Sequence, residues 1–410
     1  MEQYVVTGIG VFNGLGATAE SSWTNLLAGK TAVKELIWPE DDSSRFPATY
    51  SGIKIKLAAT SPIPEEEYPE YFNPGWHYWD PNTRACLLTV DEAIKDAGLT
   101  SKNTGVIAST FGSGTRVRLD FFTALTNGRS KVSPKKTLNM GLDYPAATIA
   151  GIYKFQGPNT AMDSACTTGL SSIDTAVNML KTDNRLDAVI VSAADHTADA
   201  IYVYWFQSLG ALSLSEDVTL ASCPWDKKRN GFVMGEGAAT IIIEPMSKAL
   251  ARGANIHGII KSSNFVTLFE SDTSPDPEGI GARLCVQGAL DKAGITANEI
   301  DYVNAHATST PIGDQIEFDA MLSLTPGRVM VSNKGQIGHG MATCGIIEVI
   351  YTLLTFRDQR SPGNANLTEP LGTGMILPNK AIDVNVKYAV KNSFGFGGRN
   401  ASVILEHYER

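Results

Sequence analysis

The sequence predicts an α/β protein whose helices cover sheets of largely parallel strands. The first observation is that strand-like apolar stretches alternate with stretches of helical periodicity along the whole chain. The second is a break near Pro245–Asn255 that separates two halves of similar character, each opening on a predicted strand. The third is size, because 410 residues that are 43% hydrophobic suffice for two core-bearing domains or one fused pair. These observations suggest a duplicated architecture, although no strong sequence repeat is visible.

The individual elements follow from hydrophobic periodicity. Strands are predicted at Tyr4–Val11, Gly105–Ser109, Ala188–Ala193, Ala239–Glu244, Ile256–Asn264, Tyr302–Ala305 and Arg328–Ser332. Helices are predicted at Thr18–Leu27, Arg84–Ala97, Ala146–Phe155, Thr167–Lys181, Gly281–Lys292, Gly313–Leu324 and Gly340–Arg357. The segment Trp38–Asp80 is rich in Pro, Glu and aromatic residues, and we expect it to form a surface excursion.

Composition excludes several classes of function. A net charge of −9 argues against a nucleic-acid-binding protein, which would usually carry a basic face. No apolar run approaches the roughly 18 residues that span a bilayer, and the N-terminal stretch lacks the pattern of a secretory signal. The five cysteines are scattered without a CxxC pair, so we expect neither disulfides nor a zinc site. A cytoplasmic location is the corresponding expectation.

Cys166 lies in the stretch MDSACTTGLSS, between a short predicted β-segment and a predicted helix. Leu170, Ile173, Val177 and Leu180 follow at helical spacing, which places the cysteine at the first helical turn. Free backbone N–H groups and the helix dipole favour an anion there, so we expect a thiol shifted toward the nucleophilic thiolate. Most free cysteines are instead small buried apolar residues, and position alone leaves both interpretations open.

Two histidines in the second half follow predicted strands. His306 comes after the strand in DYVNAHATSTPIGD, and His339 comes after the strand in VMVSNKGQIGH. Open α/β sheets bind ligands at the C-terminal ends of their strands, so both histidines are candidate site residues. The other four histidines lack a comparable setting. Near the chain end, the glycines of KNSFGFGGRNAS can bring backbone N–H groups close to a ligand.

The glycines of VVTGIGVFNGLG superficially resemble a dinucleotide-binding turn. That motif requires a second strand ending in an acidic residue about 20 positions later, and no convincing strand is present there. A tight strand-to-helix turn explains Gly8, Gly10 and Gly14 equally well.

Five motifs, in this order, resemble those of the β-ketoacyl-ACP synthases: DSACTTGLSS, CPWDKKRNGFVMGEGAA, NAHATSTPIGD, SNKGQIGH and NSFGFGGRNAS. The resemblance covers essentially the whole chain. It implies a thiolase-like fold in which two similar halves, residues 1–250 and 251–410, form a dimeric α-β-α-β-α core of five layers. The first half would carry the nucleophilic cysteine and the second both catalytic histidines.

The resemblance implies a catalytic constellation of Cys166, His306 and His339, and the second histidine favours the elongating, decarboxylating branch of the family. In this chemistry the thiolate takes an acyl chain from a thioester, while two imidazoles hold the enolate oxygen formed when malonyl-ACP loses CO2. The implied oxyanion donors are the backbone N–H groups of Cys166 and Phe396, and Phe396 is also the gate before the acyl channel. No metal or bound cofactor is required, because the partner ACP carries the phosphopantetheine arm.

The resemblance assigns supporting roles to further residues. Lys334 and Glu348 match a buried ion pair that would organise the helix after His339. We expect the role of this pair to be more structural than catalytic. Thr308 and Thr310 match positions that contact the phosphopantetheine arm. The motif NSFGFGGRNAS adds Gly397 and Gly398 as substrate-binding residues. The position of Asp314 in PIGD also predicts that it caps the helix beginning there.

Departures from the family pattern leave the partners open. Cys344 stands where alanine is commoner. Family members usually carry basic residues ahead of the helix near Arg84, suited to an acidic ACP, whereas EEEYPEYFNPGWHYWD contains none. A docking face would then lie elsewhere, with the basic residues Arg129, Lys131, Lys135 and Lys136 as candidates, or on a partner subunit.

Two classes of function remain from the sequence. The favoured one is an active elongating ketosynthase of fatty-acid or type II polyketide synthesis, either a homodimer or a heterodimer with a chain-length-factor-like subunit. The alternative is that this chain is itself a non-catalytic subunit of the chain-length-factor kind. Cys166 argues against the alternative, since those subunits usually carry glutamine at that position.

Overall fold

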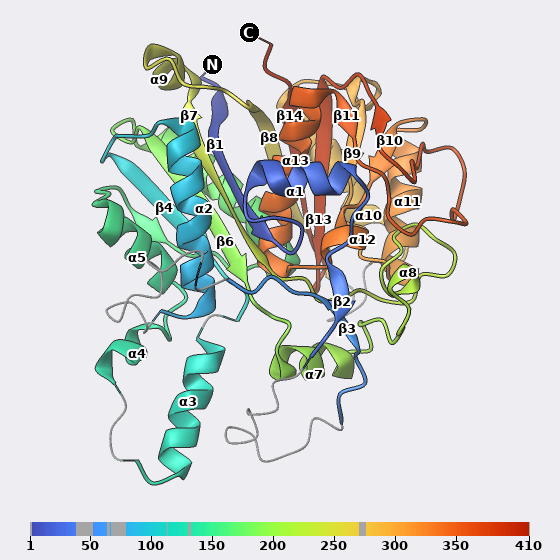
Figure 1. Ribbon diagram of the computed structural model, residues 1–410. Helices are drawn as coiled ribbons and strands as arrows, with labels where there is room; N and C mark the ends of the chain where they lie inside the picture. Colours follow the sequence, from blue (N-terminus) through green and yellow to red (C-terminus); the bar gives the residue numbers. More distant parts are fainter. Residues whose placement is uncertain are drawn as a thin grey trace.

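The computed structural model describes residues 2–37, 52–63, 66, 79–112, 114–129, 133–269 and 276–409 (Figure 1). Most of the predicted surface excursion Trp38–Asp80 lies outside these residues. Its described part contains the strand β3 (Leu57–Ala59), which pairs with β2 (Val33–Glu35).

The central feature is a sheet in which two sets of five strands follow the same order. The first set is arranged β5-β4-β6-β7-β1 and the second β10-β9-β13-β14-β8. In the order just given, the first three strands of each set pair in parallel with one another. The fourth strand pairs antiparallel with both the third and the fifth. An antiparallel pairing of β1 with β8 joins the sets. The sheet is therefore mixed, and the prediction of largely parallel strands is wrong. In each half the last strand, β7 or β14, pairs antiparallel with the first strand, β1 or β8.

The strand bounds are β1 Tyr4–Asn13, β4 Thr104–Ser109, β5 Asn159–Thr160, β6 Ala188–Asp195, β7 Gly237–Pro245, β8 Gly258–Thr267, β9 Tyr302–Asn304, β10 Val329–Val331, β13 Tyr388–Gly395 and β14 Arg399–Glu406. A further small ladder pairs β11 (Arg360–Ser361) with β12 (Ile382–Asp383). All seven predicted strands are present, with bounds shifted by up to three residues. The repeated strand order demonstrates the duplication that the sequence only suggested.

Helices fill three layers around the two sets of strands (Figure 1). On the outer faces, α2 (Pro81–Ala97) and α5 (Tyr144–Tyr153) pack on the first set, and α10 (Ile280–Ala293) packs on the second, with α11 (Pro311–Leu324) against it. Between the sets, α6 (Thr168–Thr182) and α13 (Met341–Asp358) pack against each other and against strands of both. The arrangement is the expected α-β-α-β-α order of five layers.

The central helix α13 shows why these layers form. Its residues 341–356 are all buried, so this helix is covered on every side rather than on one stripe. A helix of that kind requires protein on both faces, which the two strand sets provide. Because β1 and β8 join the halves in one sheet, the division into domains at residues 250 and 251 stays a prediction.

The remaining described helices are α1 Ala19–Leu27, α3 Thr115–Thr126, α4 Pro134–Leu138, α7 Ala200–Ser208, α8 Val218–Ala221, α9 Met246–Ala251 and α12 Lys334–Ile337. Both chain ends lie at one end of the molecule, and α3, α4 and α7 lie at the other (Figure 1). No described helix has the length and apolar character needed to cross a membrane.

Close helix packing explains the early glycines. Gly8 and Gly10 lie inside β1 rather than in a strand-to-helix turn. A Cβ at Gly10 would stand 2.2 Å from the carbonyl oxygen of Thr89 in α2, and one at Gly8 would stand 2.3 Å from that of Ala93. These glycines let α2 approach the sheet, which corrects the expected turn.

Candidate active site

Cys166 lies in a short 3-10 turn, Ala165–Thr167, that leads directly into α6. The preceding Ala165 has a left-handed backbone (φ 53°), a conformation that is rare and strained for a residue with a Cβ. The side chain of Cys166 is 5% exposed. The predicted position of this cysteine at the start of a helix is confirmed, since α6 begins two residues later.

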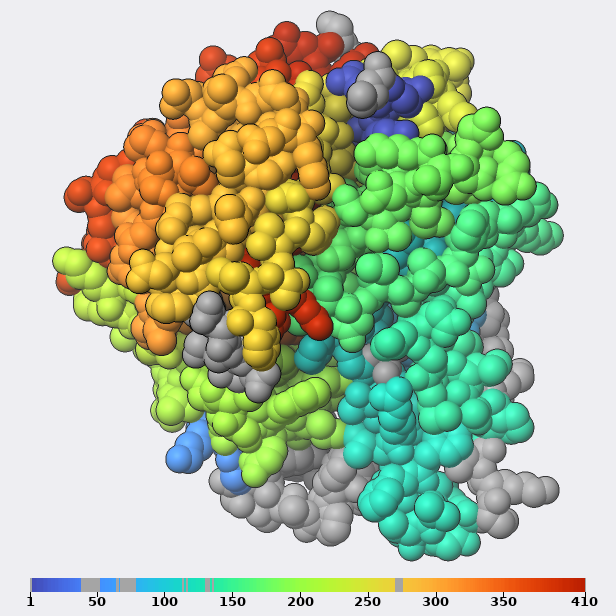
Figure 2. All heavy atoms as spheres, turned by 180° about the vertical axis from the view of Figure 1, so that it is seen from behind, coloured from blue at the N-terminus to red at the C-terminus, as the bar shows by residue number. Residues whose placement is uncertain are grey.

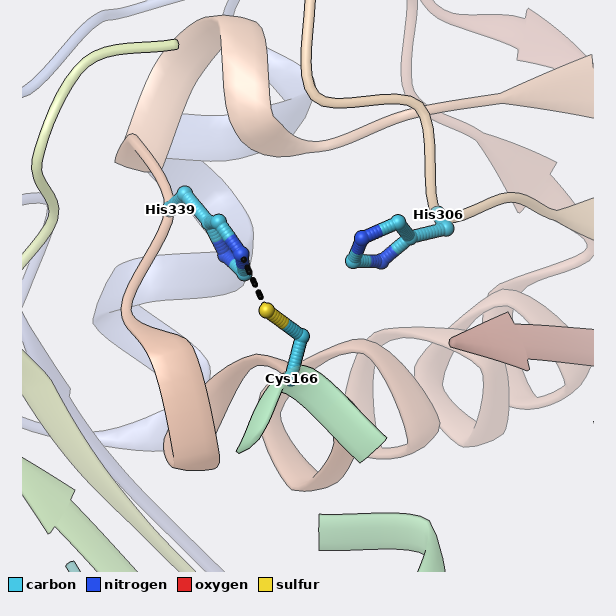
Figure 3. A group of neighbouring side chains, drawn as sticks. All are labelled: Cys166, His306 and His339. Carbon is cyan, nitrogen blue, oxygen red and sulfur yellow. Dashed lines mark hydrogen bonds between the residues drawn. The ribbon is translucent and has the colours of Figure 1, made fainter. Parts of the chain in front are cut away.

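His339 approaches the cysteine from the start of α13. Its Nε2 lies 3.1 Å from Cys166 Sγ (Figure 3). On the other side of the ring, Nδ1 lies 3.4 Å from Cys344 Sγ. The backbone N–H of Gly340 donates to Cys344 Sγ at 3.0 Å. Asp195, at the end of β6, accepts the N–H of Ala342 at 2.7 Å and so fixes the first turn of α13. The imidazole is therefore held between two thiols.

His306 follows β9 and completes the group. Its ring centroid lies 5.4 Å from that of His339, at 82° between the ring planes, and both rings face the space beside the Cys166 thiol (Figure 3). The Glu317 carboxylate on α11 accepts the backbone N–H of His306 at 2.9 Å and of Ala307 at 2.8 Å. The structure thus brings together the three residues predicted as catalytic.

A cavity of about 460 Å³ leads to this group. Its lining includes Cys166, His306 and His339. Thr308 and Thr310, whose hydroxyl oxygens lie 3.2 Å apart, also line it. Seen from behind, the surface is hollowed where yellow to orange residues of the second half meet green residues of the first half (Figure 2). Apolar side chains such as Leu268, Ile316 and Phe394 share the lining, so the cavity suits an apolar chain.

The turn Phe396–Gly398 connects β13 and β14 beside the nucleophile. Phe396 and Gly398 line the cavity. Gly397 and Gly398 both have left-handed backbone (φ 75° and 68°), and a Cβ at Gly398 would stand 1.9 Å from the carbonyl oxygen of Leu268. Only glycine fits at Gly398. The last strand residue, Gly395, packs close to the backbone N–H of Cys166, so the two predicted oxyanion donors belong to adjacent segments.

Burial dominates the protonation states at the site. It raises the pKa of the Cys166 thiol to about 12, against the lowering effects of the Lys334 charge and the cysteine's own backbone N–H. The expectation of a resting thiol shifted toward thiolate is therefore wrong. Burial, assisted by the Lys334 and Lys391 charges, also lowers the pKa of His306 and His339 well below the usual range. The resting site thus pairs a thiol with a neutral imidazole that can accept its proton.

Behind the imidazoles lies a buried cluster of charged groups. Lys334 Nζ lies 2.5 Å from Glu348 Oε1, so these two predicted partners are in contact. Since Lys334 precedes His339 and Glu348 follows it, their contact closes the loop that carries the histidine. Lys391 on β13 lies 2.9 Å from the other oxygen of the same carboxylate. One carboxylate thus serves two ammonium groups.

Asp314 lies in the first turn of α11, whose N-cap residue is Thr310. Its carboxylate accepts the N–H of Thr310 at 3.2 Å and the N–H of Trp225 at 3.1 Å, and it lies 3.9 Å from Arg229 Nε. The prediction that Asp314 caps this helix is corrected in position, because the aspartate supports the N-cap from inside the helix. Burial raises its pKa to about 7.

Two site-supporting residues escape the motif analysis, Glu317 and Lys391. A signal for Lys391 does exist, since it is the single charged residue in the strand sequence YAVKNSFG. A signal for Glu317 is weaker, because glutamate is common within helices. Neither residue can be linked to the site without knowing that β13, α11 and α13 meet there.

The ligand atoms of Cys166, His306 and His339 lie within 4.8 Å of one another, a spacing that a metal ion could bridge. The nearby ammonium groups of Lys334 and Lys391 oppose a bound cation. The sequence expectation of no metal stays a prediction.

The duplicated five-layered fold and its Cys–His–His site define a thiolase-like condensing enzyme. Two solved structures show the same fold. The ketosynthase of a type II polyketide synthase, in complex with its acyl-carrier protein, has a TM-score of 0.85 at 22% identity and covers 99% of this chain and 100% of that one. The ishigamide ketosynthase/chain length factor has a TM-score of 0.86 at 24% identity, with both chains covered in full.

Sequence comparison gives the family. The beta-ketoacyl synthase N-terminal domain matches residues 1–249, and the beta-ketoacyl synthase C-terminal domain matches residues 257–368. The 3-oxoacyl-[acyl-carrier-protein] synthase 2 of Coxiella burnetii is 31% identical over 414 residues, covering 98% of this chain and 97% of the relative. The chain therefore belongs to the β-ketoacyl synthase family, as its motifs predict, and it is a condensing enzyme of the elongating type.

Proposed function

We propose that this enzyme is an acyltransferase that joins malonyl-ACP to an acyl chain held as a thioester on Cys166. The observation that carries the proposal is the meeting of one thiol and two imidazoles in the lining of one cavity. Each half of a decarboxylative Claisen condensation finds its chemical groups among these residues. The non-catalytic alternative lacks support, because it gives the Cys166 thiol no role.

In the transfer half, Cys166 Sγ attacks the thioester carbonyl of an incoming acyl-ACP. Its proton passes to His339 Nε2 and then to the leaving pantetheine sulfur, as the new C–S bond forms and the old one breaks. The backbone N–H groups of Cys166 and Phe396 are the proposed donors to the oxyanion. Because the resting group is a thiol, this proton transfer replaces the preformed thiolate that the sequence predicts.

In the condensation half, malonyl-ACP breaks its bond to the carboxylate and releases CO2. Nε2–H groups of His306 and His339 hold the enolate oxygen, whose negative charge a carboxylate would repel. The transfer half leaves His339 with its proton on Nδ1, so this ring exchanges to the Nε2–H tautomer before malonyl-ACP reacts. The carbanion then attacks the acyl carbonyl, the bond to Cys166 Sγ breaks, and the released thiolate takes a proton from solvent to restore the resting thiol. The product is a β-ketoacyl-ACP two carbons longer.

The partner is proposed to be an acyl carrier protein, whose phosphopantetheine arm enters the cavity past Thr308 and Thr310. Gly397 and Gly398 shape the turn beside it. No cofactor on the enzyme itself is needed. The supporting relative is the solved ketosynthase described with its acyl-carrier protein.

We place the enzyme in the cytoplasm, where its buried thiols stay reduced, and we propose no nucleic-acid partner.

A second ketosynthase-like chain is the proposed subunit partner. Exposed apolar side chains gather on α3, α4 and α5 and the turn before α5: Phe122, Leu125, Leu138, Leu142 and Ile152. The short strand β5 ends the sheet and pairs with β4 alone among the described strands. An apolar face beside an open strand edge fits a two-fold interface. The solved ketosynthase/chain length factor supports a heterodimer, and a homodimer is the other proposed form.

Intact-mass measurement tests the proposed function directly. After incubation with a panel of acyl-ACPs, we expect a mass increase equal to one acyl group, located by peptide mapping at Cys166. The panel also ranks chain length, since only accepted chains are transferred. Absence of any acyl-enzyme across the panel, with the protein folded, would contradict the proposal.

Basic residues of the α3–α4 region provide a second test, on ACP docking. Arg129 is exposed and Lys136 lies 3.1 Å from Asp120, while Lys131 and the Lys135 side chain fall outside the described part of the chain. If these four residues attract an acidic ACP, their reversal to glutamate raises KM for ACP-bound substrate with kcat preserved. Raised ionic strength should reproduce the effect, because exposed charges are screened. Unchanged ACP kinetics would move the docking face to a partner subunit.

A further inference from the structure

Lys391 is a buried lysine that the condensation chemistry leaves without a role. It lies within β13 and is 0% exposed. Its Nζ contacts two acceptors, the Glu348 carboxylate at 2.9 Å and the carbonyl oxygen of Asn392. The Nζ group donates a hydrogen bond to the Asn392 carbonyl oxygen and forms an ion pair with the carboxylate.

The carboxylate that holds Lys391 already has a partner. Lys334 lies on its other oxygen at 2.5 Å, so two lysines share Glu348, and Glu317 is the second carboxylate that acts on both. A single Lys–Glu pair would close the His339 loop without Lys391. Burying a further charge is costly unless it is paired, so a second lysine on a satisfied carboxylate calls for a reason beyond stability.

The position of Lys391 connects three segments of the active site. Glu348 belongs to α13, which begins next to His339. Lys391 stands beside Asn304 in the parallel register of β13 and β9, two residues before His306. Asn304 Nδ2 donates to the carbonyl oxygen of Glu348 at 3.0 Å. On its own strand, Lys391 precedes the Phe396 turn by five residues.

We propose that Lys391 is a positioning residue of the active site, a second buried lysine on Glu348 that ties β13 to α13 and sets the local charge beside the His306 and His339 imidazoles. The inference deepens the proposed function, because both half-reactions use these two imidazoles. It names a residue that the family motifs do not.

Electrostatics gives the proposal its sign. A nearby positive charge disfavours imidazolium, and the Lys391 charge acts to lower the pKa of both histidines. The charged groups that face Lys391 are Glu348 on α13, Lys334 on α12 and Glu317 on α11. Burial and the Lys334 charge lower the pKa of Lys391 itself, while the two carboxylates act to raise it. Removing Lys391 leaves Lys334 as the one ammonium among these named groups. The imidazoles should then protonate at higher pH.

The Lys391→Met variant tests this inference. Histidine-selective NMR titration of the folded enzyme, with His306 and His339 assigned by substitution, is expected to show both rings protonating at higher pH than in the parent enzyme. The acid limb of malonyl-ACP decarboxylation should move in the same direction. At a pH on that limb the rate should fall by roughly tenfold, which corresponds to a shift of one pKa unit.

Two further variants make the result specific. Lys261→Met removes a lysine that lies 2.8 Å from Glu406 in the same sheet, and it should leave both titrations unchanged. Lys391→Gln keeps hydrogen-bond donors without the charge and should behave like Lys391→Met, also serving if the methionine variant does not fold. Unmoved titrations in a folded Lys391 variant would overturn the proposal. NMR titration needs no turnover, so it tests the role of Lys391 even if the proposed reaction is wrong.

Discussion

The Cys166→Ala variant is expected to lose acyl-enzyme formation and condensation while it keeps its fold. Alanine removes only the Sγ atom, whose polar partner is His339 Nε2 at 3.1 Å. Loss of one such contact costs about 1 kcal/mol of folding stability. Loss of the nucleophile in a covalent mechanism can cost about 10⁶ in kcat. Intact mass, condensation rate, thermal unfolding and sedimentation together measure these outcomes.

A matched control is available in another buried thiol. Cys285 on α10 is fully buried, its pKa is raised by burial to about 11, and it lies outside the residues that line the cavity. Cys285→Ala should therefore acylate normally at Cys166. Acylation of Cys86 or Cys344 in the Cys166→Ala variant would show that the nucleophile is misassigned. If the parent enzyme sediments as a monomer, the proposal of a dimer is contradicted independently of the nucleophile.

Local signals in the sequence were sufficient for the position of the nucleophile and for most elements. Helical spacing from Leu170 to Leu180 located α6, and with it the turn that holds Cys166. Periodicity also found α13, although not its burial on every side. These features depend on residues that are neighbours in the chain, which is why pattern alone suffices.

Other features depend on tertiary contacts and could not be predicted. No strand was predicted around the glycines of KNSFGFGGRNAS, yet the flanking residues form the hairpin β13–β14, which pairs with β9 and β8. Aromatic residues obscured α7, because AIYVYWFQS has strong strand propensity and yet forms a helix. The antiparallel returns likewise follow from long-range pairing rather than from local sequence.

The protonation state of Cys166 shows the same limit at the level of chemistry. A helix start favours thiolate, and this local effect was the basis of the prediction. Burial by surrounding segments acts in the opposite direction and is the larger effect. The site therefore depends on His339 to receive the proton, a requirement that no local pattern reveals.

That dependence predicts different behaviour for the two histidine variants. His306→Ala should still form the acyl-enzyme, because His339 keeps its 3.1 Å contact with Cys166 Sγ. Its malonyl-ACP decarboxylation should fall by about 10²–10³, the usual cost of one oxyanion donor. His339→Ala should slow both halves, since it removes the proton acceptor as well as an enolate donor. Acyl-enzyme mass and CO2 release, measured side by side, separate the two half-reactions.

His257→Ala is the matched control, because His257 lies at the far end of β8, where its Nε2 contacts Asp96 at 2.7 Å. This variant should retain both half-reactions. Normal decarboxylation in both site variants would mean that another group holds the enolate oxygen. Equal slowing of acyl transfer in both would contradict the asymmetry, because only one imidazole touches the thiol. Because only His339 contacts Cys166, we expect His339 to act in both half-reactions and His306 to act in decarboxylation alone. The rates of acyl transfer and of CO2 release, measured together, test this difference.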